Sequence, residues 1–390
     1  MPLGNRMTVT SPRRDWLKLV AYGAGGALLV KEGTSCSYYG AEKGDAYAPW
    51  TFPDGETRPE LISARAAILA ASPHNSQPWA LHVTPTAIDL HADFTRNLGK
   101  IDSLLRELYI GLGCALENLV IAAQASGRAT GVRLLPHTAN PSLVASVALT
   151  PAVPSKGALF EAIAHRHTNR GRYADAPPAA GLTAALAALV TEPAVELRFL
   201  TSDADKASFR ASTIDATNAF INDPELSRDS NAWYRQSADD ILKHRDGITL
   251  DASGNGALTR FFGKSLSRPS EATANSYWLD GTSGDQTTAA AFCILSSPAA
   301  NGREDQLGVG RVYQRLHLWL VSQGLAAQPL NQMAEMRDRE ETKGLPPKFA
   351  KLLNDLLGAS NRHAQMLFRI GQPQDAALKS PRRPVPWVLQ

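Results

Sequence analysis

The sequence predicts an α+β protein with an internal duplication, and three observations support this fold class. Residues 103–126 carry leucine and alanine mostly three and four positions apart, which predicts a long buried helix ending at Gly127. Residues 129–150 alternate between apolar and polar side chains and therefore predict strands. A second helical pattern spans about 308–323 and is followed by Gly324.

The two predicted helices match each other at a constant offset of 197 residues. The matched pairs are Gly111 with Gly308, Gly113 with Gly310, Leu119 with Leu316, Ile121 with Leu318, and Gly127 with Gly324. Coincidence among common residues is the alternative. However, glycines, a buried stripe and a helix cap have different structural roles, and all of them agree. We therefore expect two copies of one unit.

Composition bounds the class of protein. The chain has 390 residues, 44% hydrophobic and 20% charged, which is typical of a soluble globular protein of one large or two ordinary domains. A net charge of +3 without a Lys/Arg block does not favour nucleic acid as a partner. Cys36, Cys114 and Cys293 offer no disulfide framework and no metal-ligand spacing. No run of 18 apolar residues predicts a membrane-spanning helix.

The N-terminal region has the pattern of an export signal. Arg13 and Arg14 precede a short apolar run rich in glycine and alanine, from Leu19 to Val30, as in twin-arginine signals. Trp16 stands where such signals usually have phenylalanine. The alternative is a cytosolic helix that begins with two arginines. We expect residues 1–48 to be a signal peptide and linker, and the protein to be periplasmic.

The most informative stretch is residues 72–79, which read Ser-Pro-His-Asn-Ser-Gln-Pro-Trp. They lie between a helical apolar run and a strand-like run. Two prolines fix the backbone, and the polar side chains between them predict a preformed loop that hydrogen-bonds a planar polar ligand. The candidate binding residues are Ser72, Pro73, His74, Asn75 and Gln77.

A second motif is rich in positively charged side chains. Arg166, His167, Thr168 and Arg170 fall within five residues, at a point where a helical pattern breaks. Arginine forks bind phosphate oxygens bidentately and a threonine hydroxyl adds a donor, so this motif suits a phosphate clamp. Taken alone, it reads more readily as a charged helix end facing water.

Two further loops are weaker candidates. Gln328 and Asn331 lie in a proline-stiffened loop after Gly324, with backbone N–H groups and amides that suit the polar edge of a ring. Arg382 and Arg383 follow the last predicted strand and are available to the phosphate clamp. Each loop alone is most simply an ordinary surface loop.

Residues 203–285 are less regular and contain several loop signals, with helical segments expected near 207–221 and 229–244. We interpret this segment as a lid over a site, and an ordinary peripheral subdomain is the alternative. Its aromatic residues are Trp233, Tyr234, Tyr277 and Trp278.

Together, these motifs resemble the FMN-dependent nitroreductase superfamily over roughly residues 55–390. In ordinary members an Arg-x-Ser/Thr-x-Arg/Lys phosphate motif comes first, and a Ser-x-x-Asn-x-Gln-Pro-Trp-like loop follows shortly. Here the order is reversed and the motifs lie far apart. With the apparent duplication, this is similar to the double-domain Acg-like branch, in which one polypeptide imitates the usual homodimer.

The resemblance implies central antiparallel or mixed sheets flanked by long helices, arranged as a pseudo-dimer within one chain. Residues 49–155 would form the first half, and 156–390 the second half with the lid-like insertion at about 203–285. It also implies one FMN per chain. The second half would bind the phosphate, and the loop that begins at Ser72 would lie near the ribityl chain and ring. Backbone N–H groups around Asn331 would face flavin N5.

The implied function is an oxidoreductase that passes a hydride through flavin N5 to nitro, quinone or related acceptors, with a small-molecule electron donor. We expect no catalytic side chain and interpret His74 as a structural histidine rather than a proton donor. The alternatives are a protein that binds or sequesters FMN under a closed lid, and an exported binding protein without flavin. A pseudo-dimer needs no partner to complete its site, and further oligomerisation is left open.

Overall fold

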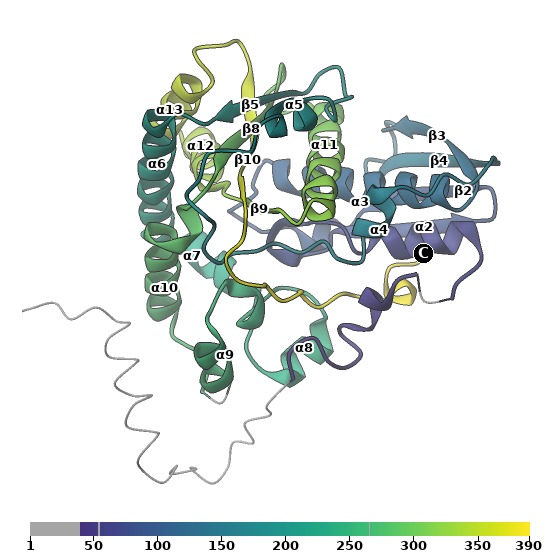
Figure 1. The fold of residues 1–390 in the computed structure, drawn as a ribbon, viewed down its shortest axis with the longest axis horizontal. Helices are drawn as coiled ribbons and strands as arrows, with labels where there is room; N and C mark the ends of the chain where they lie inside the picture. Colours follow the sequence, from purple (N-terminus) through teal and green to yellow (C-terminus); the bar gives the residue numbers. More distant parts are fainter. Residues whose placement is uncertain (1–39, 54, 265) are drawn as a thin grey trace, which may run out of the picture.

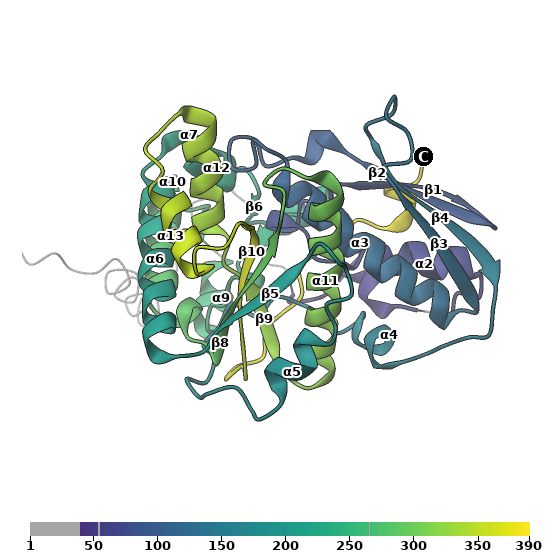
Figure 2. The same ribbon diagram turned by 90° about the horizontal axis from the view of Figure 1, so that it is seen from above.

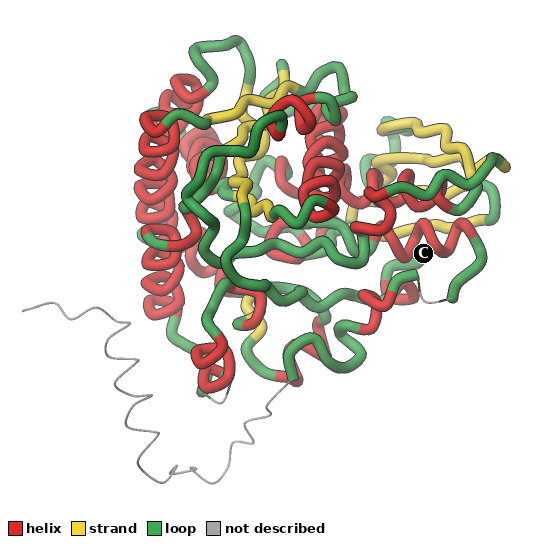
Figure 3. Tube along the Cα trace, viewed as in Figure 1, coloured by secondary structure: helices red, strands yellow, loops and turns green. Residues whose placement is uncertain are grey.

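The computed structural model describes residues 40–53, 55–264 and 266–390, and contains two separate four-stranded β-sheets joined by long helices (Figure 1). The two sheets lie on either side of a central helical layer, which Figure 2 shows from above and Figure 3 shows by secondary structure. The predicted export signal lies outside the described residues.

The first sheet is antiparallel and has four strands in the order β1-β2-β4-β3. Its strands are β1 (Trp79–Thr84), β2 (Ala87–Ala92), β3 (Arg128–Leu134) and β4 (Leu143–Pro151). Helix α3 (Arg106–Ala125) connects β2 to β3, and α2 (Pro59–Ala67) packs beside it. The inward residues of β2, Ile88, Leu90 and Ala92, are buried at alternate positions, as expected for a sheet with one face on a core.

The second sheet repeats this topology. Its order is β5-β8-β10-β9, again antiparallel, with β5 (Glu196–Leu200), β8 (Ala291–Ser297), β9 (Ala326–Pro329) and β10 (His363–Gly371). Helix α11 (Arg303–Ser322) connects β8 to β9, as α3 connects β2 to β3. Both helices have 20 residues and begin at positions that differ by the predicted offset. The α+β class and the duplicated arrangement are therefore confirmed.

The two halves meet where α3 crosses α11, at Gly113 and Gly310. A Cβ atom on Gly113 would lie 2.1 Å from the Leu307 carbonyl oxygen, and one on Gly310 would lie 2.0 Å from the Ile110 carbonyl oxygen. The contact is reciprocal, as at the interface of a two-fold dimer. Gly113 meets Leu307, and their counterparts in the other helix, Gly310 and Ile110, meet in the same way. Only glycine allows the two backbones to approach this closely.

The remaining elements are insertions and coverings. The insertion between β5 and β8 contains α6 (Asp203–Ile221), α7 (Pro224–Asn231), β6 (Tyr234–Arg235), α8 (Ala238–His244), β7 (Ile248–Thr249), α9 (Ala257–Gly263) and α10 (Glu271–Ser283). The expected helix over 229–244 is wrong in its middle, where β6 pairs with β7 instead. Elsewhere lie α4 (Ala158–Ala162), α5 (Leu182–Ala187), α12 (Gln332–Lys343) and α13 (Lys348–Leu356).

Both ends of the described chain pack onto the folded body. Ala46 and Tyr47, which fall within the expected linker, are buried, and the Ala46 carbonyl accepts a hydrogen bond from the Arg382 N–H at 2.7 Å. The C-terminal segment reaches the first sheet, where the Leu81 N–H donates to the Val388 carbonyl at 2.7 Å. The C-terminal tail of the second half is thus tied to the first half.

Among the described residues, α3 is long and apolar enough to cross a membrane by length and composition. However, 89% of its most apolar 18-residue window is buried inside the protein. Its apolar character is accounted for by its place in the core between the two sheets.

We predict that Gly310→Ala destabilises the protein by about 3 kcal/mol, because the new methyl group meets a rigid backbone carbonyl and the helices must separate. Gly308→Ala, two residues away in the same helix, is the matched control, since its Cβ would meet Val195 at an ordinary 3.5 Å. That control should change stability by about 1 kcal/mol or less, given alanine's higher helix propensity. Urea unfolding midpoints measure both, and equal midpoints would contradict the crossing.

Candidate functional site

A cavity of about 1060 Å³ brings together residues from both halves and from the insertion. Of the predicted site residues, those that line it are Ser72, Pro73, His74, Asn75, Arg166, His167, Thr168, Arg170, Gln328, Asn331 and Arg382. The loop at Ser72 and the arginine motif, about ninety positions apart in the sequence, therefore share one cavity. Gln77 and Arg383 are not part of its lining.

The loop before β1 has an unusual backbone. His74, Asn75 and Gln77 have φ values of 47°, 54° and 53°, in the left-handed region that side chains other than glycine and asparagine rarely adopt. Each such residue costs on the order of 1–3 kcal/mol and persists only where the surroundings enforce it. Strain of this kind concentrates at ligand sites, which agrees with the place of this loop at the cavity.

Hydrogen bonds hold the strained loop in place. The Asn75 amide donates to the carbonyl oxygens of Gly247 at 3.1 Å and Pro381 at 2.9 Å, and its oxygen accepts from the Arg382 guanidinium. Asn75 therefore ties the loop to the insertion and to the C-terminal segment at once. All three of its bonds are to protein groups, so its main part in the site is to position the loop.

Gln77 and Arg383 lie outside the cavity lining and hold the loop in place through bonds to protein groups. The Gln77 side chain is fully buried, donates to the Arg245 carbonyl at 2.8 Å and accepts from the Arg383 N–H at 2.8 Å. The Arg383 guanidinium in turn donates to the Gln77 carbonyl at 3.2 Å. These bonds use the polar atoms that were expected to face the cavity.

The guanidinium groups of the predicted site residues Arg166, Arg170 and Arg382 line the cavity, and no ion pair joins any of them to a carboxylate of the described residues. Burial lowers the pKa of each, and the Arg166 charge adds to the effect on Arg382. The Nε atoms of Arg166 and Arg382 are buried without a hydrogen-bond partner. Buried cations normally have a counter-charge, so this arrangement suits a bound anion.

The structure fixes Arg382 from three sides. Its guanidinium stacks over the Trp50 ring at 4.7 Å from the centroid and donates to the Ala70 carbonyl at 3.3 Å. Arg166 donates to the neighbouring Leu69 carbonyl at 3.2 Å. Because the two arginines bind consecutive carbonyls at the end of α2, they converge on one place.

The end of β9, which contains Gln328, and the residues after it form a further wall, so Gln328 lies in a strand and not in the expected loop. The Asn331 side-chain oxygen accepts from the Leu367 N–H at 2.9 Å, and Asn331 is the residue before α12. The Gln328 side-chain oxygen accepts from the Arg369 Nε at 2.9 Å. The Gln328 side-chain nitrogen donates to the Gln286 side-chain oxygen at 3.3 Å. Both residues line the cavity while being held by β10.

Sequence reasoning missed the wall that α3 provides. Glu107, Ile110, Gly111 and Cys114 all line the cavity, and their spacing places them on one face of the helix. Glu107 is the unusual member, because it is a buried carboxyl at the start of an otherwise apolar helix. A charged pair, Arg106 and Glu107, at the head of an apolar helix was the available signal.

The insertion forms the roof of the cavity. It contributes aromatic side chains, those of Tyr234, Phe262, Tyr277 and Trp278, and polar ones such as Asn231 and Asn275. Trp233 does not line the cavity. Its ring instead lies against the guanidinium groups of Arg96 at 5.5 Å and Arg235 at 5.8 Å.

The duplicated fold predicts a counterpart of the α3 wall on α11, and that position is occupied by ion pairs. Arg311, the counterpart of Cys114, is bonded to Glu117 at 3.0 Å and to Glu192 at 2.8 Å. Arg315 also pairs with Glu117, at 2.7 Å. The counterpart of Gly111 is Gly308, whose neighbours are Glu192 and Val195 instead of a polar loop. The cavity is therefore built on one side of the pseudo-dimer.

His74 is held neutral. Burial, together with the Arg170 charge, lowers the pKa of its imidazole to about 4, and its Nε2 lies 3.0 Å from the Ser230 hydroxyl. A neutral imidazole bonded to a serine agrees with the interpretation of His74 as a structural histidine.

Known proteins are similar to this chain in sequence. No protein-family profile matches the chain. The chain is 28% identical over 356 residues to "Putative NAD(P)H nitroreductase Rv3131" of Mycobacterium tuberculosis, covering 89% of this chain and 95% of that protein. It is 27% identical over 156 residues to "Putative NAD(P)H nitroreductase acg" of the same species, covering 39% of this chain and 47% of that protein. The resemblance to the nitroreductase superfamily and its Acg-like branch is thereby confirmed.

Solved structures give a weaker likeness. The FMN-dependent nitroreductase NfnB from Mycobacterium smegmatis in complex with NADPH has a TM-score of 0.38 and 15% identity, covering 60% of this chain and 97% of that chain. An iodotyrosine deiodinase bound to FMN and 3-iodo-L-tyrosine has a TM-score of 0.34 and 16% identity, covering 58% and 96%. At these TM-scores neither structure bears on the ligand of this chain.

We predict that His74 makes the protein less stable in acid. Its folded pKa lies below that of the unfolded chain, so the unfolded state binds more protons between pH 6.5 and about 4. Stability is lost as pH falls through this window, by at most about 3 kcal/mol. His74→Asn, which tolerates the left-handed backbone, should remove this part of the pH dependence. Urea midpoints at pH 7 and pH 4.5 measure it, and parallel losses in both proteins would contradict the assignment.

Proposed function

We propose that this chain is an FMN-dependent oxidoreductase of the nitroreductase type. The observation that carries the proposal is the cluster of three guanidinium groups without carboxylate partners, two of them buried, in the same cavity as a strained polar loop. A phosphate monoester supplies the missing negative charge, and its oxygens match guanidinium donors. The similarity of the chain to NAD(P)H nitroreductases along 89% of its length supports the same conclusion.

Each wall of the cavity has a role in this proposal. Arg166, Arg170 and Arg382 would hold the phosphate, with Thr168 as an additional donor. Pro73 and Asn75 would keep the loop rigid, so that the ligand meets a preformed surface and loses less entropy on binding. The aromatic roof would exclude water from the reacting groups.

When bound, FMN would supply the redox chemistry by accepting a hydride at N5 and passing it to a nitro, quinone or related acceptor. The donor would be a reduced nicotinamide or another small molecule. The chain binds and orients these molecules, and the neutral His74 keeps its bond to Ser230 rather than donating a proton.

A second candidate function is FMN binding with little turnover, which the extent of the insertion favours. The roof includes Tyr234, Tyr277 and Trp278, so access to the cavity depends on this segment. Anaerobic mixing of the FMN-loaded protein with NADPH separates the two functions. Rapid bleaching of the flavin absorbance supports the oxidoreductase, and a flavin that stays oxidised with NADPH and with NADH supports sequestration.

We predict that Arg166→Ala weakens FMN binding by about 2–4 kcal/mol, roughly 30- to 800-fold, because charge-assisted bonds to the phosphate are lost. Arg166→Lys keeps the charge without the fork and should lie between wild type and alanine. Arg228→Ala removes an exposed arginine and is the control. Quenching of FMN fluorescence measures the affinities, and riboflavin, which lacks the phosphate, should not distinguish wild type from Arg166→Ala. Unchanged FMN affinity would contradict the phosphate assignment.

We also propose that the chain is exported in folded form through Arg13 and Arg14, which is compatible with loading a cofactor before translocation. Replacing both with lysine should retain the full-length protein in the cytoplasm, whereas replacing Lys18 with arginine should not. Cell fractionation followed by immunoblotting measures this. A protein found in the cytoplasm with both arginines intact would contradict export.

A further inference from the structure

Two buried carboxyl groups from different helices line the proposed cofactor cavity. Glu107 comes from α3 in the first half and Glu335 from α12 in the second half, and both line the cavity. Their exposed fractions are only 5% and 7%. Each carboxyl lies near enough to shift the pKa of the other, and a hydrogen bond between the two would require that one of them carries a proton.

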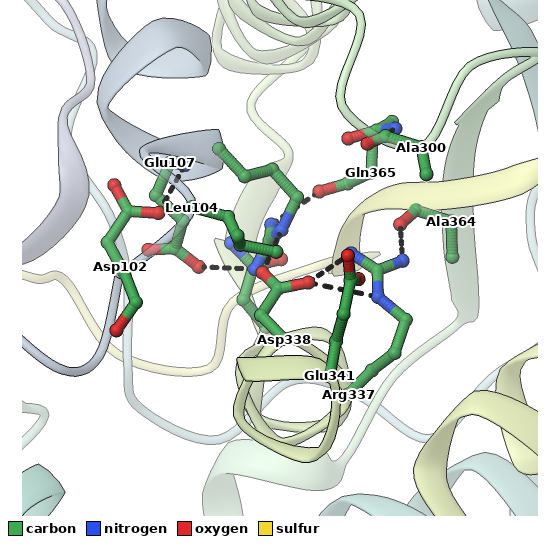
Figure 4. Close-up of polar contacts among 12 residues, drawn as sticks. Asp102, Leu104, Glu107, Ala300, Arg337, Asp338, Glu341, Ala364 and Gln365 are labelled. Atoms are coloured by element: carbon green, nitrogen blue, oxygen red, sulfur yellow. Dashed lines mark hydrogen bonds and ion pairs between the residues drawn. The ribbon is translucent and has the colours of Figure 1, made fainter. Parts of the chain in front are cut away.

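The surrounding charges leave this proton in place. Asp338 pairs with the Arg106 Nε at 2.7 Å and with Arg337 at 2.6 Å, and these charges lower the pKa of the Asp338 carboxyl against the effect of burial (Figure 4). Glu107 receives a longer bond from Arg106, 3.3 Å. The two guanidinium charges are therefore mainly matched by Asp338 and Glu107.

The other acidic group is Asp102, whose carboxylate accepts the N–H groups of Glu107 at 2.9 Å and Leu108 at 2.8 Å. Thus Arg106, Arg337 and Asp338 are the charged groups around the pair, from α3 and α12. Asp102, from the loop before α3, is a further titratable group, because burial and the Glu107 charge raise its pKa to about 7. Burial, reinforced by the Glu107 charge, raises the pKa of Glu335 well above its ordinary value. Burial also raises the pKa of Glu107.

Two further observations connect the pair to a ligand. Gln332, one turn before Glu335, lines the same cavity, and its side-chain oxygen is buried without a hydrogen-bond partner. Asn331, which also lines the cavity, lies near Glu107. Along α3, Glu107 lies seven residues from Cys114, which is near Arg166, so the carboxyl pair lies about 10 Å along the helix axis from the guanidinium groups.

We propose that Glu107 and Glu335 form a proton-holding carboxyl pair that donates a proton to the electron acceptor in this cavity. This inference rests on the proposed function, since it concerns the acceptor of the same flavin site. It assigns catalytic residues where the resemblance implies none, and it favours acceptors whose reduction creates a basic oxygen, such as quinones and nitro compounds.

The proton balance is simple for a quinone. The quinone gains two electrons and one proton as a hydride, and the resulting phenolate oxygen takes a second proton from Glu335. The O–H bond of the acid breaks as the O–H bond of the hydroquinone forms. The pair is left with two negative charges beside Arg106, and a proton from solvent restores it.

The test compares Glu335→Gln with wild type, both loaded with FMN. Glutamine keeps the size and can donate a hydrogen bond to Glu107 but has no acidic proton. In single-turnover mixing of chemically reduced protein with a water-soluble benzoquinone, we expect oxidation by the variant to be about 100-fold slower at pH 7, within the range for general acid catalysis. The wild-type rate should fall as pH rises through the pKa of the pair, and the variant should lose this dependence.

A second readout does not depend on activity. The infrared spectrum of the wild-type protein above pH 7 should contain the carbonyl band of a protonated carboxylic acid, which shifts in D₂O and is absent from Glu335→Gln. Glu341→Gln, an exposed change on the same helix, should keep the band and the rate. Absence of the band in wild type, or an unchanged rate and pH profile in Glu335→Gln with FMN retained, would overturn the proposal. Failure of wild type to bind FMN would instead contradict the proposed function, and the infrared band would still test the carboxyl pair.

Discussion

The close approach of α3 and α11 at Gly113 and Gly310 is the constraint on which the rest of the structure depends. With a carbonyl oxygen about 2 Å from where either Cβ would be, the two helix axes have only one possible separation. This crossing sets the distance between the loop that precedes β1 and the arginine motif that follows the first sheet. The cavity exists because the crossing holds these two segments, distant in sequence, against the same face of α3.

The same crossing allows two copies of one unit to become different. Both sheets have the same strand order, yet in the described part of the chain the cavity is lined by α3 and not by the matching face of α11. On the α11 side, Arg311 and Arg315 bind Glu117 and Glu192. A homodimer is bound by symmetry to keep two equal sites, whereas a fused pair can replace one site with ion pairs and stabilising contacts. The insertion is present in one half alone, which is a further consequence of this freedom.

The polar groups of the cavity are divided along α3. Unpaired guanidinium groups gather near Cys114, and carboxyl groups gather near Glu107. An anionic tail and a group that accepts a proton would therefore be bound at different ends, so the charge pattern orients the ligand as well as binding it. Backbone strain at His74, Asn75 and Gln77 keeps the connecting wall rigid.

Much of this arrangement was predictable from local patterns. The presence of α3 and α11 follows from apolar periodicity, although α11 begins at Arg303, before the expected start near 308, and the duplication follows from paired glycines at one offset. The polar loop at Ser72 and the arginine motif were found because rigid or strongly charged residues cluster there in sequence. That Gln77 and Arg383 lie outside the cavity lining could not be predicted, because only tertiary contacts decide whether an amide faces a cavity or a neighbouring backbone.

Other features could not be read from local patterns. The helix expected over 229–244 is broken by β6, where Arg235 binds Asp246 at 2.9 Å across a turn. Glu107 was overlooked because an apolar helix hides which of its faces meets a ligand. In each case the deciding partner is distant in the sequence.

The number of FMN molecules bound per chain, measured together with the mass of the complex in solution, tests the central claim most directly. The account predicts one FMN per chain by calorimetric titration, already complete in a monomer by sedimentation. Two FMN per chain would show that the α11 side is also a site. Binding of FMN by dimers alone, or failure to bind it, would contradict a site completed within a single polypeptide.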